Sequence, residues 1–225
     1  MPTAVITGAS KGIGRATALR LAPDYEIVAL ARSAGALKSL GAEIAARGGR
    51  CIAIDVDLRD PSAIAAALEG VQADVVVNNA GVMHRKPFID ITPGEWGEMM
   101  DVNVNAIYHV TRALLPRMIA KGAGHVINIS SIAGRNSFVG GSGYAATKHA
   151  VQALSEALIL EVRDYGVKVS IVMPGSVATE LTPGGSAKAW ALRPEDVAET
   201  VAQILSMPRH ALTFIVEVRA AQPGT

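Results

Sequence analysis

Residues 3–22 read TAVITGASKGIGRATALRLA, and this stretch decides the fold. It opens with a short apolar run typical of a buried strand and closes with a pattern typical of a helix. The turn between them contains Gly8, Gly12 and Gly14, which let the backbone bend tightly and approach a ligand closely. A helix that begins at such a turn points its free amides at it, which favours a bound phosphate. An ordinary glycine-rich turn is the alternative interpretation.

Further apolar runs follow, separated by helical patterns. The expected strands are 3–7, 26–31, 51–56, 74–77, 125–130, 167–172 and 212–218, and the expected helices are 12–22, 33–47, 61–69, 95–121, 144–164 and 194–206. Continuous apolar strands are typical of sheets covered on both faces. Repeated β–α alternation implies a parallel sheet with right-handed crossovers. The sequence therefore predicts an α/β fold in one Rossmann-like domain over residues 1–225. We expect a doubly wound parallel sheet of about seven strands, flanked by helices on both faces.

Composition and charge narrow the class of protein. Half of the 225 residues are apolar, 18% are charged, and the net charge is +1. This composition suits a globular protein and gives no electrostatic case for binding nucleic acid or an acidic membrane surface. Because we see no basic leader and no apolar run long enough to span a membrane, we expect a cytoplasmic protein. Cys51 is the only cysteine and the histidines show no ligand spacing, so no metal site is expected.

The glycines of residues 7–14 have the spacing G-x-x-x-G-x-G. In the first βα turn of a doubly wound pattern, this resembles the short-chain dehydrogenase/reductase family, in which TGxxxGxG holds the pyrophosphate of a dinucleotide. The resemblance continues in order through DLRD, NNAG, VN, SS, YAATK and PGSVAT, over roughly residues 3–218. In the glycine turn it implies cofactor contacts from Gly8, Ser10, Lys11, Gly12, Ile13 and Gly14.

The end of the second expected strand bears on the choice of cofactor. It reads Leu-Ala-Arg-Ser over residues 30–33, with no acid to take the ribose 2′-hydroxyl of NAD. Arg32 suits a 2′-phosphate, because a guanidinium gives paired charge-assisted hydrogen bonds, and Lys11 adds a second cation. NADP(H) is therefore favoured over NAD(H). A solvated arginine at a strand end is the alternative explanation.

Two later segments resemble the family's other cofactor contacts. Asp57 and Leu58 follow the third expected strand, where the family contacts the adenine, and Asp55 is the competing acid. Residues 78–81 read NNAG at the carboxyl end of the fourth expected strand, where ligands bind in open sheets. For the ribose side the resemblance implies contacts from Asn79, Ala80 and Gly81. Ordinary turns explain these residue types equally well.

The resemblance also selects an asparagine and a serine. Asn103 lies within a helical pattern that it does not favour, and the family's asparagine at this place supports a backbone carbonyl and a water beside the catalytic lysine. Asn105 is the weaker candidate. Of the pair at 130 and 131, the family pattern matches the second serine, thirteen residues before Tyr144, so Ser131 is the catalytic candidate and Ser130 its neighbour.

Residues 144–148 read YAATK, which places a phenol and an ammonium on one face of a helix. Tyrosine ordinarily has a pKa of about 10, and a nearby cation favours the phenolate. We therefore expect Lys148 to lower the pKa of Tyr144 and to improve it as a proton donor and acceptor. The resemblance implies that Ser131 and Tyr144 bind the substrate oxygen, while NADPH supplies a hydride and Tyr144 a proton. It also implies cofactor contacts from Tyr144 and Lys148, with Lys148 at the nicotinamide ribose.

Residues 173–180 read MPGSVATE and resemble the family's PGxVxT segment, which turns over the nicotinamide. The implied cofactor contacts are Pro174, Gly175, Val177 and Thr179. Residues 181–192 are expected to form a short substrate lid, in which Leu181 and Trp190 cover the substrate or simply pack the loop down. The candidate pocket residues are Met83, His84, Arg135, Asn136 and Phe138, of which Arg135 is more readily explained as a solvated cation than as an anion clamp.

Together these motifs predict an NADP(H)-dependent oxidoreductase that transfers a hydride between nicotinamide and a small carbonyl or alcohol substrate. An NAD-dependent alcohol dehydrogenase and a non-catalytic dinucleotide-binding sensor of the same fold are the alternatives. The helices 95–121 and 144–164 carry broad apolar faces, which in the resembling family pair between subunits. We therefore expect a homodimer or homotetramer, unless both faces pack on the sheet.

Overall fold

The β–α alternation of the sequence is present in the computed structural model, which describes residues 1–181 and 189–222. The strands are β1 (Thr3–Thr7), β2 (Glu26–Ala31), β3 (Cys51–Asp55), β4 (Val75–Asn78), β5 (Gly124–Ile129), β6 (Val167–Pro174) and β7 (Ile215–Val218). The α-helices are α1 (Gly12–Leu21), α2 (Ala34–Ala46), α3 (Pro61–Ala67), α4 (Pro93–Met100), α5 (Ala106–Lys121), α6 (Ser142–Val162) and α7 (Pro194–Leu205). Shorter elements are η1 (Phe88–Asp90), η2 (Asp101–Asn105), η3 (Ile132–Gly134) and η4 (Arg163–Tyr165).

The strands form one sheet in the order β3-β2-β1-β4-β5-β6-β7, and each neighbouring pair is parallel. From β1 the chain builds outward to β3, and from β4 it builds outward on the other side to β7. The sheet is therefore doubly wound, which confirms the predicted fold class. Its strand order reverses between β1 and β4, and the crevice at the carboxyl ends of such strands is where open α/β sheets bind ligands.

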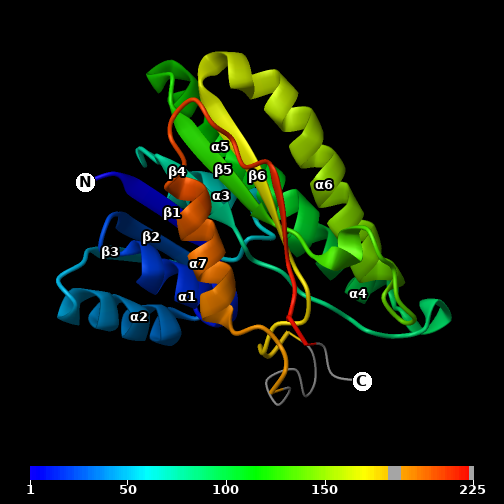
Figure 1. Ribbon diagram of the computed structural model, residues 1–225. Coiled ribbons are helices and arrows are strands. Elements are labelled where there is room, and N and C mark those ends of the chain that lie inside the picture. Colours follow the sequence, from blue (N-terminus) through cyan, green and yellow to red (C-terminus); the bar gives the residue numbers. More distant parts are fainter. Residues whose placement is uncertain (182–188, 223–225) are drawn as a thin grey trace.

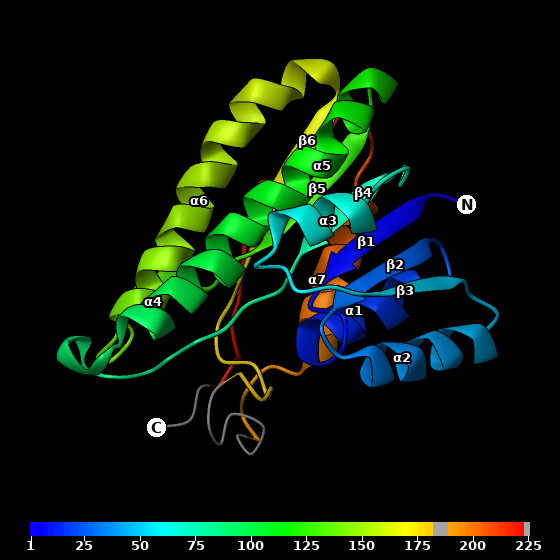
Figure 2. The ribbon, with the colours of Figure 1, turned by 180° about the vertical axis from the view of Figure 1, so that it is seen from behind.

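Helices cover both faces of the sheet (Figures 1 and 2). On one face, α1, α2 and α7 pack against the sheet, and Leu21 and Val201 share a core with Ile6 of β1. On the other face, α3, α5 and α6 pack against it, and Leu114 shares a second core with Val5 of β1. Successive residues of one strand thus enter different cores, which is why the strands are continuous apolar runs.

The expected helix over 95–121 is divided. Helix α4 begins earlier, because the Thr92 hydroxyl accepts a hydrogen bond from the Glu95 amide at 3.2 Å while the Glu95 carboxylate accepts one from the Thr92 amide at 3.0 Å. The π-helical segment η2 then separates α4 from α5. A π-turn holds one extra residue and re-aims the side chains around it. Among them, Asn103 is fully buried.

The remaining boundaries differ from the prediction by a few residues. The largest difference is in the last strand, where pairing with β6 begins only at Ile215, three residues later than expected. At the preceding Thr213 the carbonyl instead accepts a hydrogen bond from the Ser170 side chain, at 2.6 Å. Over residues 1–181 and 189–222, no helix is both long and apolar enough to cross a membrane.

Candidate active site

The side chains of Ser131, Tyr144 and Lys148 come together at the carboxyl end of β5. Ser131 lies two residues after that strand, and the other two residues lie one turn apart near the start of α6. A hydrogen bond joins the Ser131 and Tyr144 side chains. The Lys148 ammonium lies 5.6 Å from the centroid of the Tyr144 ring. The structure therefore gathers the three residues that the sequence selected for chemistry.

Backbone groups hold this cluster in place. Lys148 is only 4% exposed, and its Nζ donates a hydrogen bond to the Ile129 carbonyl at 2.8 Å. The hydroxyl of Ser130 donates to the Lys148 carbonyl at 3.2 Å. The Ser131 Oγ accepts a hydrogen bond from the Ala133 amide at 3.1 Å. Ser130 thus ties α6 to the end of β5, while the Ser131 hydroxyl reaches Tyr144.

The acidity of Tyr144 differs from the sequence prediction. Burial raises the pKa of Tyr144 to about 12, and the hydrogen bond with Ser131 offsets only part of this rise. Burial also lowers the pKa of Lys148 to about 8. The expected lowering of the Tyr144 pKa is therefore wrong for this structure, because the cost of removing a phenolate from water dominates. At neutral pH, Tyr144 is a protonated phenol and hence a proton donor.

Asn103 connects two segments that flank the cluster. Its side chain exchanges two hydrogen bonds with the backbone of Val82, donating to the carbonyl at 2.9 Å and accepting from the amide at 2.8 Å. It also donates to the hydroxyl of Thr147 at 3.0 Å. The support of a backbone carbonyl is thus present, beside the residue that precedes Lys148. Asn105, by contrast, is exposed and donates to Asp101.

The glycine turn brings the ends of β1 and β4 very close together. Gly8 has a φ of +65°, and a Cβ added there would lie 2.9 Å from the Cα of Ala80. A Cβ added at Gly14 would lie 2.4 Å from the Gly8 carbonyl oxygen and 2.5 Å from the Asn79 amide nitrogen. The same amide nitrogen donates to the Thr7 carbonyl at 3.0 Å. Asn79 therefore locks the turn, which has no room for larger residues.

Helix α1 begins directly at this turn. Lys11 occupies its N-cap position without a capping hydrogen bond from its side chain, and no acid lies in the first helical turn. The first amides of a helix carry a partial positive charge and need an acceptor. The start of α1 is therefore suited to a phosphate. The site also lies at the reversal of the strand order, as the sequence predicted for a dinucleotide.

The predicted adenine and 2′-phosphate residues lie at the ends of β2 and β3. The Arg59 Nε donates to both carboxylate oxygens of Asp57, at 3.0 Å each. Mainly through these hydrogen bonds, Arg59 lowers the pKa of Asp57 to about 2, and Arg32 adds a smaller attraction. Leu58 is buried, whereas Asp55 is exposed at the strand end. The sequence analysis did not predict the Arg59–Asp57 ion pair, although Arg59 carries the opposite charge only two residues away.

The segment after β6 reaches back to the glycine turn. The Gly175 amide donates to the Val218 carbonyl at 2.8 Å, and Val177 forms an isolated parallel bridge with Leu192. A Cβ added at Gly12 would lie 3.3 Å from the methyl group of Thr179, so these two residues are neighbours. The sequence analysis missed the next residue, Glu180, whose carboxylate lies 2.7 Å from the Lys11 ammonium. Its adjacency to PGSVAT was the available signal.

The candidate pocket residues have different surroundings. Met83 packs against a cluster that contains Tyr144. The His84 Nε2 lies 2.8 Å from a Glu98 carboxylate oxygen. The Arg135 guanidinium lies 3.1 Å from the Glu217 carboxylate, which favours a paired surface cation over an anion clamp. Asn136 is exposed.

The predicted lid falls only partly within the described residues. Residues 182–188 lie outside them, whereas Leu181 and Trp190, at the edges of that range, are both exposed. Whether 181–192 covers a substrate therefore stays a prediction.

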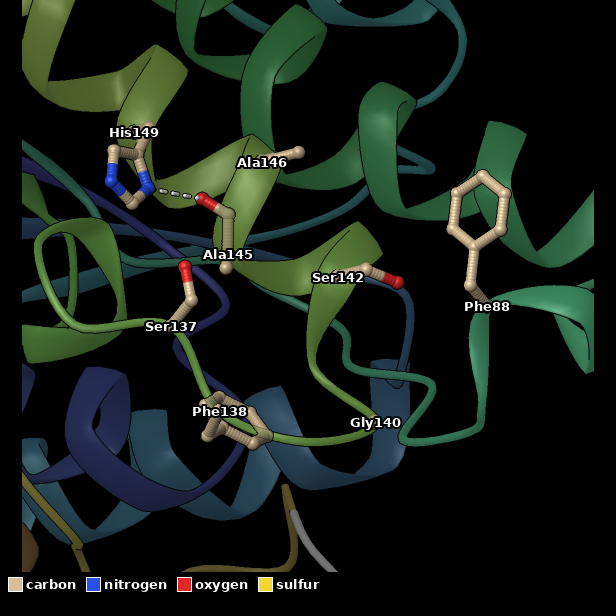
Figure 3. Close-up of a pocket in the computed structure, with 8 residues that line it drawn as sticks. All are labelled: Phe88, Ser137, Phe138, Gly140, Ser142, Ala145, Ala146 and His149. Atoms are coloured by element: carbon tan, nitrogen blue, oxygen red, sulfur yellow. Dashed lines mark hydrogen bonds between the residues drawn. The ribbon is translucent and has the colours of Figure 1, made fainter.

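A hollow of about 460 Å³ lies along α6 (Figure 3). It is lined by Phe88, Ser137, Phe138, Gly140, Ser142, Ala145, Ala146 and His149. The ring of His149 turns back to hydrogen bond with the Ala145 carbonyl, and Phe138 is the one predicted pocket residue on this wall. Ser131, Tyr144 and Lys148 are not among its lining residues, although Ala145 and Ala146 lie between two of them in the chain. In the part of the chain that the structure describes, no group of three His, Cys, Asp or Glu side chains could hold a metal ion.

A doubly wound parallel sheet with an uncapped glycine turn and a serine–tyrosine–lysine cluster defines a class of dinucleotide-binding α/β enzymes. Comparison with known proteins narrows this class. A family model described as short chain dehydrogenase matches residues 2–190. The oxidoreductase UcpA of Escherichia coli K12 is 33% identical over 215 residues, which span 93% of this chain and 82% of UcpA.

Solved structures give the same result. A metagenomic short-chain oxidoreductase in complex with NADP is 36% identical, with a TM-score of 0.88 over 99% of this chain and 98% of that one. The alcohol dehydrogenase of the archaeon Thermococcus sibiricus, complexed with 5-hydroxy-NADP, is 29% identical, with a TM-score of 0.91 over 100% of both chains. The protein belongs to the short-chain dehydrogenase family and is an oxidoreductase of that family.

Proposed function

We propose that the protein is an NADP(H)-dependent carbonyl reductase that also runs in reverse as an alcohol dehydrogenase, with Tyr144 as the general acid and base. One observation carries this proposal: Tyr144 is buried, which raises its pKa to about 12, shares a hydrogen bond with Ser131 and lies beside a buried lysine. A neutral phenol and a hydroxyl on the same side of a strand end are suited to binding a carbonyl oxygen, and the phenol has a proton to give.

The residues at the strand ends fit a dinucleotide. The packing at Gly8 and Gly14 admits no side chain, which keeps the turn tight, and α1 begins there with amides that no side chain caps. The residues that would hold the cofactor are Gly8, Ser10, Lys11, Gly12, Ile13, Gly14, Arg32, Asp57, Leu58, Asn79, Ala80, Gly81, Tyr144, Lys148, Pro174, Gly175, Val177 and Thr179. When bound, the cofactor supplies or accepts the hydride.

The protein's own residues manage the proton. Ser131 and Tyr144 bind the substrate oxygen, and Tyr144 passes its proton to that oxygen during reduction. The Lys148 ammonium, 5.6 Å from the ring centroid, stabilises the phenolate that results. Asn103 holds Val82 and Thr147 at fixed places on either side of the cluster, which supports a positioning role. The water beside the lysine that the resemblance implies stays a prediction.

The preference for NADP(H) rests on charge. Arg32 and Lys11 lie at the ends of β2 and of the glycine turn, and β2 ends without an acid that would take a ribose 2′-hydroxyl. The two similar structures described above hold NADP or a derivative of it, which supports the same choice. NAD(H) remains the competing cofactor.

We also propose that the protein is a homodimer or homotetramer through α5 and α6. Both helices have apolar surface that the sheet does not cover: Tyr108 on α5 is 49% exposed and Leu160 on α6 is 62% exposed. Sedimentation velocity tests this proposal, because a single species with the mass of one chain would contradict it.

A turnover assay tests the proposed function. NADPH and NADH oxidation are followed on a panel of ketones, aldehydes and quinones, with the wild type, Tyr144→Phe and Tyr165→Phe. Removing the Tyr144 hydroxyl is expected to lower kcat/KM by about 100-fold or more. The matched change at Tyr165, an exposed residue in η4 beyond the end of α6, is expected to leave turnover unchanged. Equal background rates in all three would favour the non-catalytic sensor, and faster turnover with NADH would favour the NAD-dependent alternative.

A further inference from the structure

The Lys11–Glu180 ion pair crosses the mouth of the proposed phosphate site. Lys11 is the N-cap residue of α1, and Glu180 comes from the segment after β6, yet their charged atoms lie 2.7 Å apart. Lys11 lowers the pKa of the Glu180 carboxyl below its usual range, so the acid is ionised at neutral pH. A carboxylate is thus paired with a lysine that we propose to contact the cofactor.

Glu180 is held there by its own segment. The Ala178 amide donates to the Leu192 carbonyl at 2.7 Å, and the Leu192 amide donates to the Ser176 carbonyl at 3.0 Å. One residue before Glu180, the Thr179 methyl group lies against Gly12. These contacts place the backbone before Glu180 next to the glycine turn, which brings its side chain within reach of Lys11.

The pair itself is easily broken. The side chains of Lys11 and Glu180 are 69% and 71% exposed, and exposed ion pairs contribute only about 0.2–1 kcal/mol. The 2′-phosphate of NADP⁺ is a monoester that carries up to about two negative charges and offers three acceptor oxygens. The pyrophosphate carries about two negative charges over its two phosphates, compared with one charge on a carboxylate. Lys11 therefore gains by exchanging the carboxylate for a phosphate, and Glu180 then becomes a negative charge beside a bound anion.

We propose that Glu180 is an affinity-limiting residue for the cofactor: it competes with the cofactor's phosphates for Lys11, and cofactor binding exchanges one partner for the other. This inference rests on the proposed function and assigns a role to a residue outside the family motifs quoted above. The phosphate in question belongs to the pyrophosphate or to the ribose 2′-position, and NAD⁺ and NADP⁺ distinguish the two because only NADP⁺ has the second.

The test is a calorimetric titration of NADP⁺ and NAD⁺ into the wild type, Glu180→Gln and Glu199→Gln. The matched control Glu199 pairs with Arg20 of α1 at 2.6 Å, so its substitution removes a similar ion pair elsewhere on the same helix. Glu180→Gln is expected to tighten NADP⁺ binding about two- to fivefold at low salt, and this gain shrinks as ionic strength rises. Glu199→Gln leaves both affinities unchanged.

A double-mutant cycle completes the test. In a Lys11→Gln background, the gain in cofactor affinity from Glu180→Gln is expected to shrink. Only long-range repulsion between Glu180 and the phosphates then remains, because there is no lysine for which they compete. A gain for NADP⁺ alone supports competition with the 2′-phosphate, and an equal gain for both cofactors supports competition with the pyrophosphate. Unchanged or weaker binding in Glu180→Gln overturns the inference alone. A wild type that binds neither cofactor overturns the proposed function as well.

Discussion

The sheet has two sides, β1–β3 and β4–β7, each with the helices that follow its strands, and they bury different kinds of side chain. Among the described residues before β4, the only buried polar side chains are Thr7 and Thr17. From β4 onward the buried polar side chains are Asn78, Asn103, Thr111, His125, Asn128, Ser130, Thr147, Lys148, Gln152, Ser155 and Ser170. The first side shapes its site with glycines and backbone amides. The second side buries polar groups that must satisfy one another.

The difference matters because the two sides have different tasks in the proposed reaction. On the second side, the Asn78 amide donates to the Asn128 side chain, and the Asn128 amide donates to Ser155, both at 2.8 Å. This chain of hydrogen bonds joins β4 to β5 and α6, and the proposed catalytic cluster lies just after β5 and on α6. Binding a phosphate requires space and free amides, whereas placing a phenol for proton transfer requires a rigid polar frame.

The largest effect is expected on the glycine side, from Gly14→Ala. The added Cβ has no room between the Gly8 carbonyl oxygen and the Asn79 amide nitrogen, at 2.4 and 2.5 Å. The turn must shift, so we expect the Kd for NADPH to rise by about 100-fold. Overpacking also lowers the free energy of unfolding by about 1–3 kcal/mol. Fluorescence titration and urea unfolding measure the two effects.

Gly41→Ala is the matched control for that substitution. A Cβ added at this position in α2 meets nothing within 4 Å, so the same chemical change should stabilise the helix by about 0.5–1 kcal/mol. NADPH affinity should stay at the wild-type value. If Gly14→Ala kept the NADPH affinity and stability that Gly41→Ala keeps, the tight packing of the glycine turn would not be required for cofactor binding.

On the polar side, Asn128→Ala is expected to lower the free energy of unfolding by about 3 kcal/mol, because it deprives buried Asn78 and Ser155 of a partner. Urea unfolding at neutral pH measures the loss. Truncating the exposed Gln72 in the same way should change stability by no more than about 0.5 kcal/mol. A loss at Asn128 as small as that at Gln72 would show that the polar frame contributes nothing.

A smaller effect on the same side comes from His125, whose pKa is lowered to about 4, chiefly by burial. The unfolded chain, with a histidine pKa of about 6.5, therefore binds more protons between these two values. The stabilising effect of the neutral ring is complete above about pH 6.5 and is lost as the pH falls toward 4, with about 2 kcal/mol lost by pH 5.

Urea unfolding at pH 7 and pH 5, on the wild type and His125→Asn, measures this loss. The carboxylates whose pKa values are lowered in the folded chain interfere little, because their stabilising effect is lost mainly below the ordinary carboxyl pKa of about 4. They are Asp57, Glu95, Glu180, Asp196, Glu199 and Glu217. The variant should lose less stability than the wild type between the two pH values. An identical loss in both proteins would assign it to another group.

Much of the fold and of the motif order could be predicted from the sequence. The strands were recognisable because burial on both faces requires continuous apolar runs, and the turn at residues 7–14 has a spacing that few other structures need. The pairing of Ser131 with Tyr144 followed from the resemblance. In each case, a local pattern reflects a local physical requirement.

The features that the sequence did not predict depend on three-dimensional surroundings. The pKa of Tyr144 is set by burial against distant elements, which spacing along one helix does not describe. The segment η2 inserts one residue into an otherwise regular helix, a change too small for a periodic pattern to detect. The Lys11–Glu180 pair joins residues 169 positions apart, so only the folded chain brings them together.

The central claim is that the glycine turn binds the cofactor's phosphates while the Tyr144 hydroxyl supplies the proton, and Tyr144→Phe, which removes only that hydroxyl, separates the two. The most direct measurement determines the Kd for NADPH and the carbonyl turnover on the same preparation of this variant. We predict a Kd within about twofold of the wild type and a turnover lower by about 100-fold or more. Wild-type turnover in the variant, or a loss fully explained by weaker NADPH binding, would contradict the account.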